Sequence, residues 1–204
     1  MGRASDAKER LMEAVTELIW TGSYGATTID QICERAGVKK GSFYYFFQSK
    51  ADLAKVAIDA GWKEHRAKLD AIFSASLPPL DRLRHYCELG YQEQVEMKAK
   101  FGYVLGCPLC TLGSEVSTQE SDLREKVQEI MDQMRMYLES TIRDAHAACL
   151  IVAPDASAKA RMLYAYYEGL MTQARIENDV ELLRALWSRT AEVLGVKSAE
   201  PLVI

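Results

Sequence analysis

Long hydrophobic runs are missing from this chain of 204 residues. No apolar stretch approaches the roughly 20 residues that a membrane-spanning helix needs, and the opening residues MGRASDAKER contain no signal-peptide core. We therefore expect no contact with a membrane and a cytoplasmic location. The sequence also lacks low-complexity segments and any internal repeat, which argues against a disordered linker and against a solenoid.

Cysteine is sparse and odd in number, with five in the chain. Five cysteines in a cytosolic protein do not indicate a disulfide scaffold. No segment shows the alternating pattern of a β-strand, so a thioredoxin-like enzyme, which needs a βαβ setting, is disfavoured. What is present, 49% hydrophobic and 26% charged residues, fits a globular protein with a substantial core.

The charge is unevenly distributed. The net charge is -4, but residues 1–50 hold seven Lys and Arg against six Asp and Glu, and the remainder holds eighteen against twenty-three. From Arg35 to Lys50 there are four cations and no carboxylate. Such a local positive excess in an acidic chain predicts binding of a polyanion by this segment alone.

The same segment has the pattern of two short helices joined by a tight turn. Thr28 and Gln31 are spaced as a capping box, and Gly37 ends the first helix. In a helix-turn-helix, residues near the start of the second helix face DNA bases while its flanks hold phosphates. The side chains placed for this are Lys39, Lys40, Ser42, Tyr44 and Tyr45. The alternative is a solvated helical hairpin whose lysines only maintain solubility.

Helical periodicity continues through the rest of the chain and predicts an all-α fold of about nine helices. The first three would form an N-terminal helix-turn-helix domain, and the others a helical ligand-binding and dimerisation domain. The expected helices outside the helix-turn-helix cover about 6–21, 50–73, 121–149, 156–176 and 180–194, and two more begin at Pro79 and Pro108.

Two cysteines lie in a second informative segment, GCPLC. Proline is favoured at the first position of a helix, so Cys107 before Pro108 is predicted at a helix N-cap, where the helix dipole favours a thiolate. Cys110 follows one turn later. Three interpretations remain open: both thiols are buried packing groups, Cys107 is reactive with Cys110 as its resolving partner, or the pair binds a metal together with His85 or His146.

The residues GSFYYFFQSK, from Gly41 to Lys50, resemble the N-terminal signature of the tetracycline-repressor (TetR) family. The resemblance implies a homodimeric transcriptional regulator, most often a repressor, with a DNA-binding domain over 1–50 and a ligand-binding and dimerisation domain over 51–204. It implies double-stranded operator DNA and a small-molecule effector as partners, no cofactor and no enzymatic activity. By position it assigns phosphate contacts to Thr28, Tyr44 and Lys50, and base or mixed contacts to Lys40, Ser42 and Tyr45.

The residues GCPLCTLGSEVS are similar to a motif of a TetR branch that includes NemR-like regulators, which respond to electrophiles and oxidants. In that resemblance Cys107 is the sensing cysteine, and Arg175 stands where a lysine is expected. A regulator of the same fold with a noncovalent effector and purely structural cysteines is the first alternative. A small helical enzyme with Cys107 as nucleophile is the second.

Overall fold

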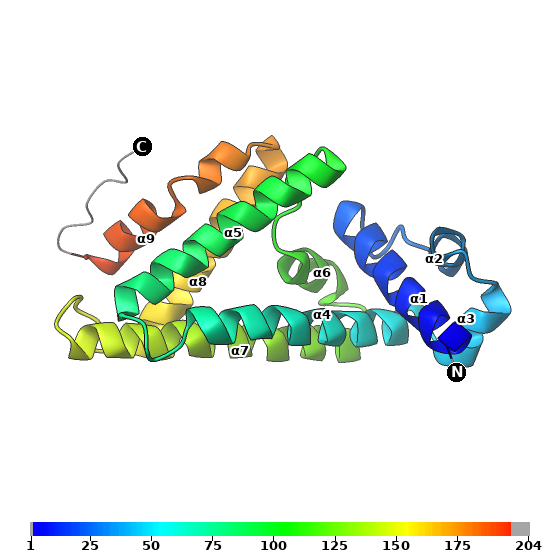
Figure 1. The fold of residues 1–204 in the computed structure, drawn as a ribbon, viewed down its shortest axis with the longest axis horizontal. Helices are drawn as coiled ribbons and strands as arrows, with labels where there is room; N and C mark the ends of the chain where they lie inside the picture. Colours follow the sequence, from blue (N-terminus) through cyan, green and yellow to red (C-terminus); the bar gives the residue numbers. More distant parts are fainter. Residues whose placement is uncertain (1, 197–204) are drawn as a thin grey trace. The chain divides into compact units, whose positions relative to one another are not determined.

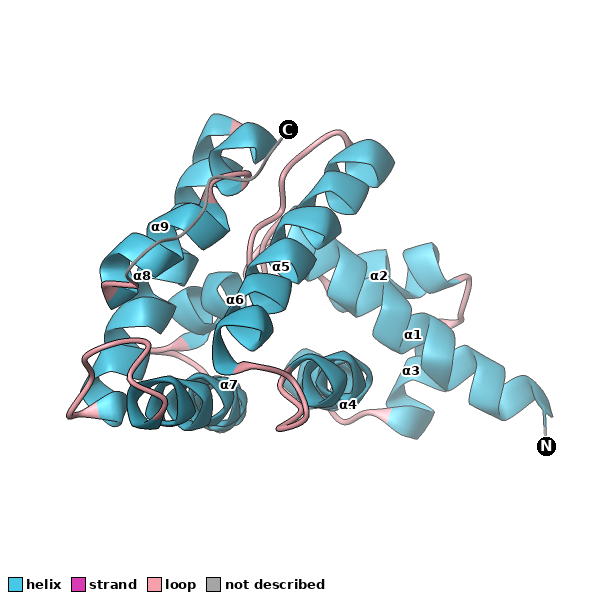
Figure 2. Ribbon diagram, turned by 60° about the vertical axis from the view of Figure 1, so that its left-hand side comes forward, coloured by secondary structure: helices cyan, strands magenta, loops and turns pink. Residues whose placement is uncertain are grey.

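The computed structural model describes the backbone of residues 2–196 and the side chains of residues 6–196, and this part contains helices and no strand (Figure 1, Figure 2). Its nine α-helices and one 3₁₀-helix confirm the predicted all-α fold. They are α1 (Gly2–Thr21), α2 (Ile29–Ala36), α3 (Lys40–Phe46), α4 (Lys50–Ile72), α5 (Pro79–Phe101), α6 (Pro108–Val116), α7 (Ser121–Ala147), α8 (Ala156–Glu177), the 3₁₀-helix η1 (Val180–Leu183) and α9 (Leu186–Leu194).

The helices form two compact units. The first comprises residues 2–66 and Pro108–Ile130, and so contains α1 to α3, most of α4, α6 and the start of α7. The second comprises Ala67–Cys107 and residues 131–196, with α5, most of α7, α8, η1 and α9. The functional division predicted at residue 50 remains a prediction.

In the first unit, local signals account for the helix-turn-helix. The Thr28 hydroxyl accepts the backbone N–H of Gln31 at 3.2 Å, and the Gln31 side chain accepts the backbone N–H of Thr28 at 2.8 Å, which is the predicted capping box. Gly37 ends α2 with φ 61, a left-handed conformation that glycine adopts at little cost. Phe43 and Phe47 are buried, and their packing fixes which side of α3 remains outside.

The end of the chain differs from the single helix expected over 180–194. Residues Val180–Leu183 form a 3₁₀-helix, and α9 begins only at Leu186. A 3₁₀-helix has three residues per turn, so residues three apart lie on the same side. Leu183 and Leu186 are both buried. Residues three apart also share a face in an α-helix, so the apolar pattern of the sequence does not distinguish the two helix types.

Two further helix ends differ slightly from expectation. The helix α1 starts at Gly2 rather than near Asp6, and α7 ends at Ala147 rather than at Cys149. Cys149 has φ 58, and a left-handed residue cannot continue an α-helix. None of the helices described by the model is long and apolar enough to cross a membrane.

Candidate DNA-binding and effector site

The helix α3 presents polar and aromatic side chains to solvent. Tyr44 and Tyr45 are 55% and 78% exposed, which is unusual for large aromatic residues. Each ring contacts a phenylalanine edge-on, Tyr44 with Phe43 at 5.2 Å and Tyr45 with Phe46 at 4.9 Å between ring centroids. The other predicted contacts on this segment are also accessible, with Thr28, Lys39 and Lys40 exposed and Ser42 half-buried.

Lys40 has a partner that the sequence pattern did not indicate. Its ammonium lies 2.7 Å from the Asp30 carboxylate of α2, and this hydrogen bond and charge raise the pKa of Lys40. Both side chains are largely exposed, so the pair is screened by water and adds little stability. The ion pair instead orients the Lys40 side chain. To contact DNA, Lys40 must either keep its bond to Asp30 while it binds or break that bond.

Lys50 is engaged inside the first unit. Its ammonium donates to the backbone carbonyls of Tyr24 at 2.6 Å and Thr27 at 2.8 Å, and it lies 4.1 Å from the centroid of the Tyr24 ring. Burial lowers the pKa of Lys50, although nearby Glu115 and Glu120 oppose this effect. Two of its three N–H donors are thus used to hold the α1–α2 turn, which leaves one for a phosphate.

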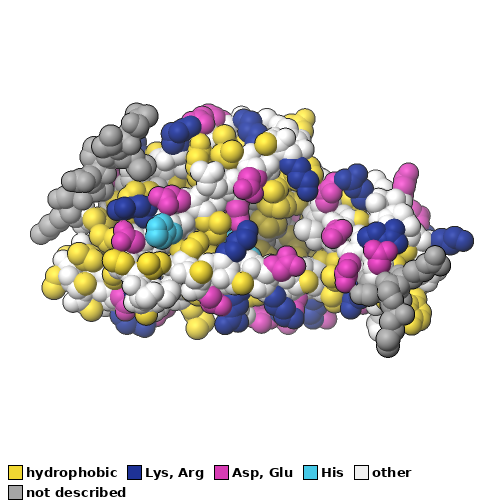
Figure 3. All heavy atoms as spheres, in the orientation of Figure 1, with side chains coloured by type: hydrophobic (Ala, Val, Ile, Leu, Met, Phe, Trp, Pro, Cys, Tyr) yellow, Lys and Arg dark blue, Asp and Glu magenta, His cyan; other side chains and the backbone are white. Residues whose placement is uncertain are grey.

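On the face of the molecule drawn in Figure 3, charge alone does not mark a binding site. On the side of the molecule in Figure 3, basic and acidic side chains are interspersed. Several exposed cations are in ion pairs, as in Arg35 with Glu17 and Arg189 with Glu192. The feature that fits DNA is the group of accessible side chains at α3, namely Lys39, Lys40, Tyr44 and Tyr45.

In the second unit, the segment before Cys107 is fixed by two side chains. The buried Gln94 of α5 accepts the backbone N–H groups of Leu105 at 3.0 Å and Gly106 at 2.8 Å, and donates to the Gly106 carbonyl at 3.2 Å. Arg175 of α8 donates to the Leu105 carbonyl at 2.7 Å. Arg175 therefore has a structural contact of its own at the position where the motif resemblance expects lysine.

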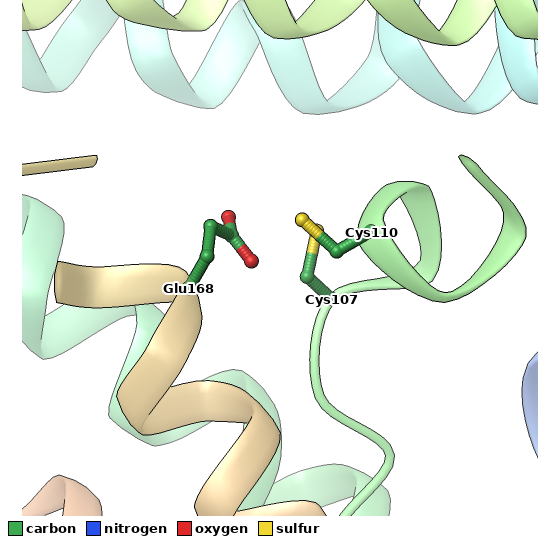
Figure 4. Close-up of side chains that lie close together, drawn as sticks. All are labelled: Cys107, Cys110 and Glu168. Carbon is green, nitrogen blue, oxygen red and sulfur yellow. The ribbon is translucent and has the colours of Figure 1, made fainter. Parts of the chain in front are cut away.

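Cys107 is half-buried and directly precedes Pro108, the first residue of α6, as predicted. Glu168 of α8 approaches it: the thiol and a carboxylate oxygen lie within 4.8 Å, turned toward one another (Figure 4). The start of a helix favours a thiolate, whereas a neighbouring carboxylate repels it. The helix start and the Glu168 carboxylate thus have opposite effects on ionisation of the Cys107 thiol. The sequence indicates only the effect of the helix start.

Two stacked tyrosines belong to the same electrostatic neighbourhood. Tyr86 of α5 and Tyr167 of α8 stack with ring centroids 4.7 Å apart. Burial raises the pKa of both hydroxyls well above its ordinary value, and the charges of Glu168 and Cys107 act in the same direction. At neutral pH both hydroxyls are therefore neutral hydrogen-bonding groups.

Two other cysteines and one histidine have structural roles. None of the five cysteines, all of which lie in the described part of the chain, forms a disulfide, and burial raises the pKa of Cys87 to about 12 and also raises that of Cys33, as expected for packing residues. Cys110 lies on the first turn of α6 and is half-buried. The ring of His146 accepts the backbone N–H of Ala153 at 3.3 Å and so closes the α7–α8 loop.

The residues that sequence reasoning missed are Asp30, Gln94, Glu115 and Glu168. Each of these residues contacts a side chain or backbone group from a different part of the chain. Because such contacts depend on tertiary structure, no local sequence pattern indicates them. The predicted metal alternative invoked His85 or His146. Among the described residues, the potential ligand that the fold brings to Cys107 from a distant segment is Glu168 instead.

Comparison with known proteins agrees with this architecture. The model of the N-terminal region of bacterial regulatory proteins of the tetR family matches residues 11–57. A model described as a tetracyclin repressor-like C-terminal domain matches residues 79–189. The two matches together include α3 and the helices that surround the Cys107 loop.

Individual relatives are transcriptional regulators. The transcriptional regulator AcuR of Cereibacter sphaeroides is 31% identical over 179 residues, which are 85% of this chain and 78% of the relative. The transcriptional repressor NemR of Escherichia coli is 24% identical over 195 residues, 93% of this chain and 94% of the relative. A TetR regulatory protein of Rhodobacter sphaeroides has a similar structure, with a TM-score of 0.80, 27% identity, and coverage of 92% of this chain and 98% of the other.

The matched models, the relatives and the exposed α3 lead to one assignment. The proteins of this family are regulators and not enzymes, which excludes the alternative of a helical enzyme with Cys107 as nucleophile. The chain belongs to the TetR family and is a DNA-binding transcriptional regulator.

Proposed function

We propose that the protein is a homodimeric repressor that leaves its operator when a small-molecule effector acts at Cys107. The observation that carries the proposal is the presentation of this half-buried thiol on a loop fixed by Gln94 and Arg175. The relative NemR is named a repressor, and a regulator of transcription acts where the chromosome lies, in the cytoplasm.

The DNA-binding part of the proposal concerns α3 and its flanks. Thr28, Tyr44 and Lys50 contact phosphates, and Lys40, Ser42 and Tyr45 reach base edges, with Lys39 beside them. Support comes from the exposure of the α3 tyrosines and lysines. A twofold dimer presents two such helices, and both contact DNA only when their separation is about one helical turn, roughly 34 Å.

The homodimer is supported by the outer face of α8. Small or apolar residues recur there at helical spacing and are exposed: Ala158, Met162, Ala165, Gly169, Thr172 and Ile176. Met162 and Ile176 are 46% and 77% exposed, and a side chain added at Gly169 would meet nothing within 4 Å. A helix face of small and apolar residues, bordered by Arg161 and Gln173, is suited to close packing against its own copy.

The sensing step is proposed to be covalent. The Cys107 sulfur adds to an electron-poor alkene, so that a C–S bond forms, the alkene π bond breaks and the neighbouring carbon takes a proton. A noncovalent effector is the second candidate. It is favoured by the neutral hydroxyls of Tyr86 and Tyr167, which are suited to orient an organic ligand through hydrogen bonds.

The test uses the full-length protein and a footprinted site in its own upstream DNA. N-ethylmaleimide should release the wild-type protein from this DNA and should not release Cys107→Ser. The matched control is Cys149→Ser, which removes an exposed thiol elsewhere and should behave as wild type. Release of Cys107→Ser at the wild-type rate would exclude covalent sensing at this residue and favour the noncovalent effector.

A further inference from the structure

The Glu115 carboxylate of α6 forms hydrogen bonds to the turn between α1 and α2. Glu115, near the end of α6, accepts the backbone N–H of Tyr24 at 2.8 Å with one oxygen and that of Gly25 at 2.5 Å with the other. Both N–H groups belong to the turn between α1 and α2. A carboxylate that accepts two backbone N–H groups forms strong, charge-assisted hydrogen bonds and fixes the turn in orientation as well as position.

The same turn supports Lys50. Its ammonium is bonded to the carbonyls of Tyr24 and Thr27 and lies over the Tyr24 ring. A second carboxylate, Glu120, accepts the Tyr24 hydroxyl at 3.1 Å. Glu115 thus binds the N–H groups of this turn, and the carbonyl groups of the same turn bind Lys50. Lys50 is the first residue of α4 and a proposed phosphate contact.

The packing at Gly25 shows how closely this carboxylate is seated. A Cβ atom added at Gly25 would lie 2.9 Å from the Glu115 oxygen, closer than real Cβ atoms approach other atoms. The obstacle is the end of a flexible side chain, so alanine at this position would displace the carboxylate and leave the backbone of α6 unaffected. Gly25 and Glu115 therefore offer two independent ways to break the same contact.

We propose that Glu115 is a positioning residue for DNA binding: by holding the α1–α2 turn, it fixes the Lys50 ammonium in the orientation that meets the DNA backbone. The carboxylate touches no DNA itself. The Glu115 contact gives α6 a role in DNA binding in addition to its position after Cys107. The inference rests on DNA binding by this family and needs no effector.

Glu115→Gln keeps the size of the side chain but leaves one acceptor oxygen for two N–H groups, and its amide N–H₂ repels the second. Operator affinity should fall about 5- to 20-fold, because part of the free energy of the lost charge-assisted hydrogen bond must then be spent on ordering the turn when DNA binds. Removal of a negative charge alone would strengthen binding to DNA slightly. The matched control is Glu125→Gln, which changes an exposed carboxylate of the same unit 3.5 Å from its neighbour Arg124, and the affinity of this variant should not fall.

Hydrogen exchange gives a readout that does not depend on DNA. The amides of Tyr24 and Gly25 should exchange faster in Glu115→Gln and in Gly25→Ala, while those of α5 stay unchanged. A Glu115→Gln/Lys50→Ala double variant should bind DNA about as weakly as Lys50→Ala, because both changes act on one contact. Equal affinity of Glu115→Gln and Glu125→Gln, or fully additive losses in the double variant, would overturn the proposal. No effector is added, so failure of effector sensing leaves this test unaffected.

Discussion

The carboxylate beside Cys107 leads to a quantitative prediction about thiol reactivity. Glu168→Gln keeps the shape of the side chain and removes its charge. The thiol and the carboxylate oxygen lie within 4.8 Å of one another, and at that limit Coulomb repulsion between a carboxylate and a thiolate is about 0.9 kcal/mol in water and about 3.5 kcal/mol at an effective dielectric constant of about 20. The half-buried site lies between these limits, so removal of the charge should increase the thiolate population of Cys107 roughly 4-fold to 350-fold.

The rate increase will be smaller than the gain in thiolate, because a thiolate that forms more easily is also a weaker nucleophile. With a Brønsted coefficient of about 0.4 to 0.5, alkylation of Cys107 should accelerate roughly 2-fold to 30-fold. The assay is iodoacetamide labelling at constant pH, followed for each cysteine by peptide mass spectrometry.

Two references make the labelling result specific. The exposed Cys149 should react at the same rate in wild type and variant. Glu177→Gln, which removes an exposed carboxylate from the end of the same helix, should leave Cys107 unchanged. An unaltered Cys107 rate in Glu168→Gln would refute the view that Glu168 restrains this thiol.

Three further predictions concern other parts of the molecule. Lys40→Ala and Tyr44→Ala should each weaken operator binding by about 1 to 3 kcal/mol without changing the dimer, as measured by fluorescence anisotropy and light scattering; wild-type affinity at physiological salt would remove them from the set of contacts. Gly169→Arg places a long cation on the open face of α8 and should give a folded monomer by light scattering. The control variant Glu88→Arg, at an exposed position of α5, should remain dimeric. A dimeric Gly169→Arg would place the interface elsewhere. The Asp59 carboxylate lies 2.6 Å from Lys126 and 2.8 Å from Lys63, and these hydrogen bonds lower its pKa below 3.8. Its stabilisation is therefore present above pH 3.8 and lost as the pH falls through the lowered value. Asp59→Asn should cost about 0.5 to 1 kcal/mol at pH 7 in urea unfolding, and a difference from wild type that persists unchanged below this transition would contradict the assignment.

Local features were the ones that the sequence could predict. The capping box of Thr28, the left-handed Gly37 and the helix start at Pro108 depend on neighbours a few residues away, and all three are observed. The break between η1 and α9 was not predicted, because a 3₁₀-helix and an α-helix place apolar residues at similar spacing. Propensity alone does not choose between them when both bury Leu183.

The site was only partly predictable for the same reason. The sequence indicated that Cys107 precedes a helix, but not that Glu168 approaches it or that Gln94 supports its loop. The DNA contact of Lys50 is a prediction from family resemblance, while its bonds to the α1–α2 turn depend on tertiary packing that no local pattern indicates. A single sequence contains no spacing rule for contacts between distant segments.

The glycine before Cys107 changes how the Gly-Cys pair should be used to compare regulators. Gly106 is buried with φ 64, and a Cβ atom there would lie 3.3 Å from the Met171 carbonyl. Backbone geometry, not thiol chemistry, therefore requires this glycine. We expect relatives that retain the loop to keep the glycine even where another residue replaces the cysteine. A search on the pair would then exclude proteins with the same loop and a different effector, whereas a search on the glycine with its Gln94 anchor would retain them.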